Sequence, residues 1–198
     1  MMADRATKAG GDDNSMIHVA VVSFRPEIVE MLHRYVGGIL KGLAVVEGCT
    51  TEQALKKKFD LYVVYTTGIV FRQLNKTIET ERIIPVDLFP MPQGIKRVLM
   101  LPEFSRLGVI AGHIWDASDL LAQLLMTGVR NYSLCTGTVD NAAKMAVDYY
   151  VLPEEIAPYV KEKKIRDNMV VIPRVLDSKS VSKIISTAIK TGSASSGS

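Results

Sequence analysis

Two stretches of this chain, residues 17–89 and 106–176, each alternate short apolar strand segments with amphipathic helical segments. Strands that alternate with helices are typical of parallel sheets built from right-handed β-α-β units. A Pro-rich segment, residues 89–94, separates the two stretches. We therefore predict an α/β protein with two Rossmann-like lobes, mostly parallel sheets and a ligand crevice between the lobes. A single continuous sheet is the alternative that the same pattern allows.

The same pattern divides the 198 residues into four parts. Residues 1–15 are polar and aperiodic, and we expect a disordered leader there. Residues 16–94 form the first α/β lobe, and residues 95–190 form the second lobe together with the C-terminal helix. Residues 191–198 are rich in Gly and Ser, which predicts a flexible tail.

Local signals place individual elements in the first lobe. Residues 17–22 are almost continuously apolar, as expected of a strand covered on both faces. Pro26 suits the first turn of the following helix, because no N–H is needed there. Thr50 and Gln53 have the spacing of a capping box. Pro85 cannot donate to a sheet ladder, so we expect its strand at a sheet edge.

In the second lobe, apolar runs predict strands at residues 107–112, 132–135, 149–152 and 169–172. We expect Asp116 to cap the helix after the first of these strands and Gly128 to end it. Asp177 or Ser178 is expected to cap the last helix. Its apolar face has the most regular spacing in the chain: Val181, Ile184, Ile185, Ala188 and Ile189.

Composition and charge exclude several classes of protein. A net charge of +3 does not by itself indicate a nucleic-acid-binding protein. The two cysteines, Cys49 and Cys135, form no CxxC pair, which fits a reducing compartment and argues against a disulfide scaffold or zinc module. No apolar run approaches the ~20 residues needed to span a bilayer, and residues 1–5 lack the apolar core of a signal peptide. We expect a cytoplasmic protein with no membrane partner.

The loops that follow parallel strands face the ligand crevice, and four of them here carry more than simple turn formers. Small residues at helix N-termini let backbone N–H groups approach a carboxylate or phosphate, and an arginine can clamp such an anion with two hydrogen bonds. The predicted ligand-binding residues are Ser23, Arg25, Thr66, Thr67, Gly68, His113, Trp115, Thr136 and Thr138.

Each of these residues also has a structural interpretation. The Ser, Thr and Gly residues are common caps and turn formers. Trp115 can stack on a ligand or fill the lobe interface, and His113 can be a pH-sensitive ligand contact or a solvated turn residue. The convergence of four loops on one crevice favours ligand binding.

No motif predicts a cofactor, a metal or a catalytic residue. The loop at residues 23–27 contains no glycine, so the GxGxxG dinucleotide fingerprint is missing, and GxxxxGK[ST] is absent. A phosphoacceptor receiver needs acidic residues after its first strand, where Ser23 stands. HxH, HExxH and Cys/His clusters are also absent, so no metal site is expected.

Two other functions stay open. Cys49 and Cys135 fall one in each lobe, each before a threonine near a helix start, which is compatible with a two-cysteine racemase or isomerase whose thiols have a lowered pKa. The second alternative is a dimerisation or interaction domain whose crevice is filled by its own side chains. The pattern favours a binding protein over either.

Three stretches carry a likeness to a known family: residues 59–64 with 67–68, residues 84–88 with 93–99, and residues 107–111 with 174–181. With them, the segment 60–189 resembles the effector-sensing domains of bacterial transcription regulators. The closest patterns are the N-terminal sensor of the propionate-catabolism activator and the ligand-binding half of some GntR-type regulators. The resemblance implies a bacterial sensor that binds a polar or anionic metabolite between its lobes. Homodimerisation is the other expected partnership, and DNA would be bound only through a module absent from this chain.

Overall fold

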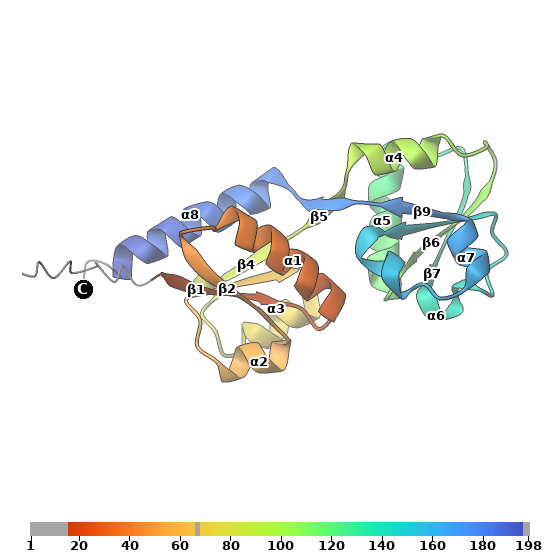
Figure 1. Cartoon of the computed structure of the whole chain (residues 1–198). Coiled ribbons are helices and arrows are strands. Elements are labelled where there is room, and N and C mark those ends of the chain that lie inside the picture. The colour runs from red at the N-terminus through yellow and green to blue at the C-terminus, as the bar shows by residue number, and fades with distance from the viewer. Residues whose placement is uncertain (1–15, 66–67, 196–198) are drawn as a thin grey trace, which may run out of the picture.

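The structure is a computed structural model that describes residues 16–65 and 68–195. Two lobes lie side by side, each built on its own four-stranded parallel sheet (Figure 1). The predicted α/β fold with two Rossmann-like lobes is therefore confirmed, and the single-sheet alternative is excluded. The predicted leader, residues 1–15, and the candidate residues Thr66 and Thr67 lie outside the described residues.

The first sheet has the strand order β2-β1-β3-β4. Its strands are β1 (Ile17–Val22), β2 (Ala44–Cys49), β3 (Leu61–Tyr65) and β4 (Ile83–Val86). The helices between them are α1 (Pro26–Ile39), α2 (Thr51–Lys56), α3 (Gly68–Leu74) and the 3-10 turn η1 (Thr80–Arg82).

The second sheet repeats this order as β7-β6-β8-β9. Its strands are β6 (Arg106–Ala111), β7 (Ser133–Thr138), β8 (Tyr149–Pro153) and β9 (Met169–Ile172). The connecting elements are α5 (Ile114–Met126), α6 (Val139–Ala142), the 3-10 turn η2 (Glu154–Tyr159) and α7 (Lys163–Asp167).

The repetition extends to single hydrogen bonds. The N–H of His18 donates to Oδ2 of Asp60 at 2.7 Å, and the N–H of Arg106 donates to Oδ2 of Asp148 at 2.8 Å. Both pairs are separated by 42 residues in the chain and tie the start of a central strand to the turn before its neighbour. The two lobes are thus two versions of one β/α unit.

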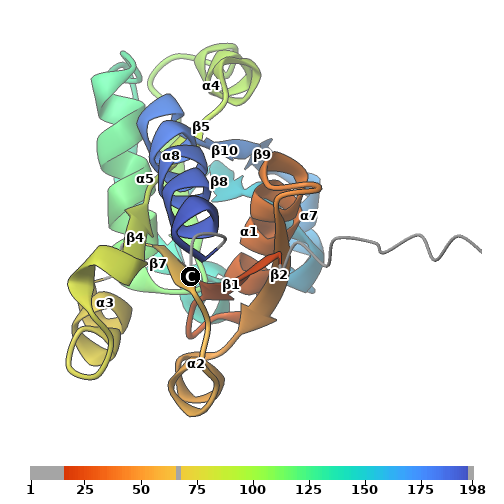
Figure 2. The same ribbon diagram turned by 90° about the vertical axis from the view of Figure 1, so that its left-hand side faces the viewer.

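The lobes exchange their last helices. Strands β5 (Leu88–Pro90) and β10 (Arg174–Leu176) form an antiparallel ribbon between the lobes. Beyond β5, α4 (Pro92–Leu99) packs against β9 of the second lobe. Beyond β10, α8 (Ser178–Ser195) returns to the first lobe and lies beside α1 (Figure 2). The chain therefore crosses between the lobes twice, through this ribbon.

This exchange corrects the division expected from the sequence. The C-terminal helix packs in the core of the first lobe, where Ile184 and Ala188 are buried with Val36 of α1. The expected boundary between residues 94 and 95 falls inside α4. Helix α8 also continues to Ser195, so residues 191–195 belong to a helix rather than to a flexible tail. Gly192 of this segment lies beside β1, where a Cβ added to it would be 3.8 Å from Cγ2 of Ile17.

Each sheet is covered by helices on both faces, which is why its central strands read as continuous apolar runs. Val19 and Val21 of β1 face α1 and α8, whereas Ala20 and Val22 face α2 and α3. The second lobe likewise holds one apolar cluster against α4 and α5 and another against η2 and α7. Among the described residues, no helix combines the length and the apolar character that a membrane span requires.

Most local predictions are confirmed. Pro26 is the first residue of α1, Thr50 and Gln53 form a capping box, and Pro85 lies in the edge strand β4. Gly128 follows α5 with a positive φ of 96°. The prediction for Asp116 is wrong. The helix begins at Ile114, so His113 caps it by accepting the N–H of Trp115 at Nδ1, and Asp116 lies inside the first turn, where it pairs with Arg25.

Asp177 caps α8, the helix that joins the chain end to the first lobe. Its Oδ1 accepts the N–H of Ser180 at 2.8 Å, and its Oδ2 accepts the Ser180 hydroxyl at 2.6 Å. Burial works against the charged carboxylate, but the hydrogen bonds from Ser180 and Lys179 outweigh it and hold the pKa of Asp177 below its usual 3.8.

We predict that Asp177→Ala lowers the free energy of unfolding by about 1 kcal/mol, the usual loss for a helix cap. Because the folded-state pKa is lowered, this stabilisation is fully present above about pH 4 and disappears as the pH falls through the folded pKa. Urea unfolding at several pH values measures it. An unchanged midpoint at pH 7 would contradict the capping role. Ser178→Ala, one residue further on, is the control and should leave stability nearly unchanged.

Candidate functional site

The carboxyl ends of the two sheets face each other where the two lobes meet, and we call this region the crevice. Arg25, after β1, reaches Asp116 near the start of α5, which follows β6. Tyr65, the last residue of β3, meets Arg174 of β10, which in turn contacts Glu155 after β8. This edge is where open α/β folds place their ligands.

Arg25 forms the first bridge between the lobes. Its guanidinium pairs with Glu27 on its own helix, with Nε 2.7 Å from Oε1, and with Asp116 on the opposite lobe. Arg25 is 9% exposed and Asp116 is 3% exposed. The backbone N–H of Arg25 donates to the buried hydroxyl of Ser23 at 3.2 Å, which fixes the turn that aims the arginine across the crevice.

Gly112 makes room for this bridge. A Cβ at position 112 would overlap with Nη2 and Cζ of Arg25. Because the obstacle is a guanidinium held by two carboxylates, it cannot turn aside without breaking its ion pairs. A side chain at this position would therefore force the lobes apart or release Arg25.

Arg174 forms the second bridge. Its side chain is 1% exposed and pairs with Glu155, whose own side chain is 4% exposed. Nη1 donates to the Tyr65 hydroxyl at 3.3 Å, and the guanidinium lies 5.8 Å from the centre of the Tyr65 ring. The hydroxyl of Tyr35 donates to the Arg174 carbonyl at 2.6 Å. Through Arg174, strand β10 is thus bound to both lobes.

The crevice holds an excess of buried acceptor atoms. Oδ1 of Asp116 and Oε2 of Glu155 are buried and have no hydrogen-bond partner among residues 16–65 and 68–195, as is also true of Nε of Arg174. The pKa of the nearby Asp119 carboxyl is raised, first by burial and then by the charges of Asp116 and Asp87. Burial also raises the pKa of Tyr65, which therefore stays protonated at neutral pH. Carboxyl groups therefore outnumber the two arginines in this region.

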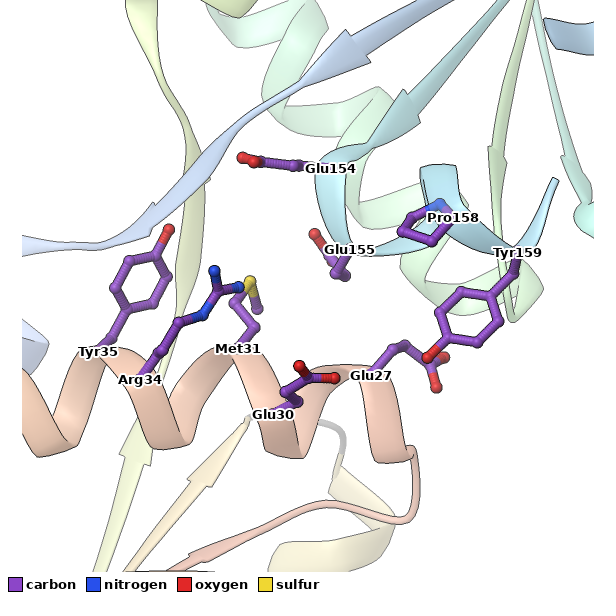
Figure 3. Close-up of a pocket in the computed structure, with 9 residues that line it drawn as sticks. All are labelled: Glu27, Glu30, Met31, Arg34, Tyr35, Glu154, Glu155, Pro158 and Tyr159. Atoms are coloured by element: carbon purple, nitrogen blue, oxygen red, sulfur yellow. The ribbon is translucent and has the colours of Figure 1, made fainter.

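Beside the two bridges, a cleft of about 590 Å³ opens between α1 and η2 (Figure 3). We call it the α1–η2 cleft. One wall comes from the first lobe and the other from the second, and its volume lies in the range of small-molecule sites. The residues that line it are Glu27, Glu30, Met31, Arg34, Tyr35, Glu154, Glu155, Pro158 and Tyr159.

The structure brings together only some of the predicted ligand-binding residues. Ser23 and Arg25 lie at the crevice, where Arg25 joins the lobes through carboxylates. His113 caps α5, and Trp115 in its first turn is 67% exposed. Gly68 is the first residue of α3.

Thr136 and Thr138 have structural roles in the second lobe. Thr136 lies in the edge strand β7 and pairs with Val109 of β6. Thr138 forms a capping box with Asn141 at the start of α6, as its sequence position predicts.

Sequence reasoning missed the residues of the α1–η2 cleft and the second bridge. Helical periodicity places Glu30 and Arg34 on the polar side of α1, where nothing in the sequence distinguishes them from solvated residues, and it places Tyr35 on the apolar face. Arg174 did offer a signal: a charged residue between Pro173 and two apolar residues, in a strand-like run, needs a buried partner.

The two cysteines lie apart from this crevice chemistry. Cys49 is buried at the end of β2 and borders a second hollow, of about 320 Å³, on the first lobe. Cys135 is exposed in β7. Burial raises the pKa of both thiols, and Glu47 raises that of Cys49 further. Acid–base catalysis by a cysteine pair needs a thiolate, which these environments disfavour at neutral pH.

Comparison with protein-family models, with curated proteins and with solved structures gave no match. Within residues 16–65 and 68–195, no group of three or more His, Cys, Asp or Glu side chains is arranged to hold a metal ion.

We predict that Arg25→Ala destabilises the closed arrangement of the lobes. It leaves Asp116 buried without its partner, and losing one member of a buried ion pair costs about 3–5 kcal/mol. Opening of the crevice would hydrate Asp116 and limit the loss. Thermal unfolding should therefore show a lower Tm, and Gly112→Ala should lower it in the same way.

A double-mutant cycle separates the bridge from a simple loss of packing. The double variant, Arg25→Ala with Asp116→Ala, should lose less unfolding free energy than the two single variants lose in sum, because it removes the uncompensated charge as well. Strict additivity would show that Arg25 and Asp116 do not depend on each other.

Proposed function

We propose that this chain is an effector-binding domain that takes a small polar molecule into the α1–η2 cleft and signals its presence through lobe closure. The observation that carries the proposal is the cleft itself, which is walled by residues of both lobes. A molecule that touches both walls binds the closed arrangement better than an open one. That difference in affinity is what a two-state sensor needs.

The β5/β10 ribbon supports this role as the hinge. The lobes are joined by two short strands, β5 and β10, rather than by a shared sheet. Arg174 in β10 is held by Tyr35 and Tyr65 of the first lobe and by Glu155 of the second. Glu155 also lines the α1–η2 cleft, so a bound molecule and the hinge share a residue. Occupation of the cleft would stabilise the hinge in one arrangement.

The proposed output is regulation of transcription in a bacterium, with the DNA contacted through another module. Support comes from the resemblance of residues 60–189 to effector-sensing domains of bacterial regulators and from the two-lobed fold which that resemblance implied. The centre of the crevice is filled by the two arginine bridges, as an interaction domain would require, but the α1–η2 cleft beside them is open.

We predict that a screen of amines, amino acids, organic acids, sugar phosphates and nucleotides finds a class that raises the Tm by a few degrees. A ligand at one hundred times its Kd adds about 2.7 kcal/mol to stability. In the Arg25→Ala variant, whose lobes are expected to separate, the hit should also reduce the radius of gyration in small-angle scattering. Tyr159→Ala, on the cleft wall, should weaken the binding of this ligand several-fold. The control Phe104→Ala, at a residue 82% exposed outside the cleft, should leave binding unchanged. A hit unaffected by Tyr159→Ala, or a screen without hits, would contradict the proposal.

A further inference from the structure

The α1–η2 cleft is lined by four carboxylates and a single guanidinium. Glu27 and Glu30 come from α1, and Glu154 and Glu155 come from η2 on the opposite lobe (Figure 3). Arg34 is the lone cation in the lining. Carboxylates from two lobes repel one another as the cleft closes, unless positive charge lies between them.

The arginines that flank the cleft do not reverse this balance. Arg25 is occupied by Glu27 and Asp116, and Arg174 is occupied by Glu155. To reach either of these two arginines, an anionic ligand would have to displace a carboxylate from it and leave that carboxylate buried without a partner, which is costly. The two strongest donors of the crevice are therefore committed to joining the lobes.

Two of the four carboxylates in the cleft are free. The side chains of Glu30 and Glu154 make no hydrogen bond or ion pair with any part of the chain that the structure describes. Glu155 lines the cleft (Figure 3), its side chain is almost fully buried, and its Oε2 has no hydrogen-bond partner among the described residues. A buried carboxylate oxygen without a donor is destabilising, and an N–H group of a bound cation would satisfy it.

The remaining wall suits the body of an organic cation. Tyr35 and Tyr159 present aromatic rings, and Met31 adds a polarisable thioether. Aromatic rings attract cations through their negative faces. Arg34 makes no ion pair among the described residues and leaves room for a carboxylate on the same ligand, so amino acids with cationic side chains fit as well as simple amines.

We propose that the ligand of the α1–η2 cleft is an organic cation, an aliphatic ammonium or guanidinium compound held by Glu30 and Glu154 at the rim and by Oε2 of Glu155 inside. This inference rests on the proposed function and adds the charge class of the effector. Its positive charge draws the acidic walls of the two lobes together, which couples binding to closure.

Isothermal titration of the whole chain with four probes tests this. Agmatine carries two positive charges, arginine adds a carboxylate, citrulline replaces the guanidinium of arginine by a neutral isostere, and glutarate is an anion of similar length. Agmatine and arginine should bind saturably, citrulline at least about fivefold more weakly than arginine, and glutarate should neither bind in the cleft nor displace agmatine.

Variants of the rim assign the binding to the cleft. Glu30 and Glu154 are both exposed, so Glu30→Gln with Glu154→Gln should fold normally and weaken agmatine about tenfold. Glu81→Gln in η1 removes an exposed carboxylate outside the cleft and is the matched control, which should bind as the wild type does. Amide shifts of ¹⁵N-labelled protein should cluster on α1 and η2.

The outcomes separate this inference from the proposed function. Glutarate binding with shifts on α1 and η2, in place of agmatine, would overturn the cationic ligand and keep the effector cleft. Unchanged agmatine binding in the double variant would overturn it as well, because the rim carboxylates would then not hold the cation. If neither agmatine nor arginine binds, the cationic class is wrong, and the metabolite screen alone decides whether the cleft binds an effector.

Discussion

Arg25 and Arg174 cross between the lobes with almost no contact with water, and the arrangement of the whole molecule depends on their charges staying paired. A buried guanidinium without a carboxylate is costly, so the closed crevice is stable only while Asp116 and Glu155 stand opposite these arginines. Surrounding features follow from this constraint. Position 112 must be glycine, Ser23 must hold the turn before Arg25, and strand β10 must carry Arg174 at the point where both lobes converge.

Paired charges also suit an interface that opens reversibly. An apolar interface of the same size would expose apolar surface to water on opening, whereas the charged groups of two ion pairs are hydrated when the lobes separate. The exchange of α4 and α8 between the lobes leaves the short β5/β10 ribbon as the connection between them. In the function we propose, a ligand beside this ribbon, in contact with Glu155, would bias the two arrangements with few contacts.

The fold could be predicted from the sequence because its signals are local. Periodicity marks the strands and helices, and side chains such as Pro26, Thr50 and Pro85 act within a few residues of themselves. The return of α8 to the first lobe could not be predicted, because its apolar face would fit either sheet equally well. The site was harder to predict because its contacts are not local. Arg25 was expected to bind a ligand anion, but it pairs with Asp116, which lies 91 residues away in the chain.

The most direct test of this account is the distance between the lobes with and without the Arg25 bridge. Cys135 is exposed in the second lobe and Cys49 is buried, so nitroxide labels can be placed at Cys135 and at Lys76→Cys in the first lobe. Pulsed electron–electron double resonance should give one narrow distribution of label distances for the labelled protein that retains Arg25. Adding Arg25→Ala should produce a second population at longer distance. Identical distributions for the two proteins would show that the buried ion pair does not hold the crevice closed.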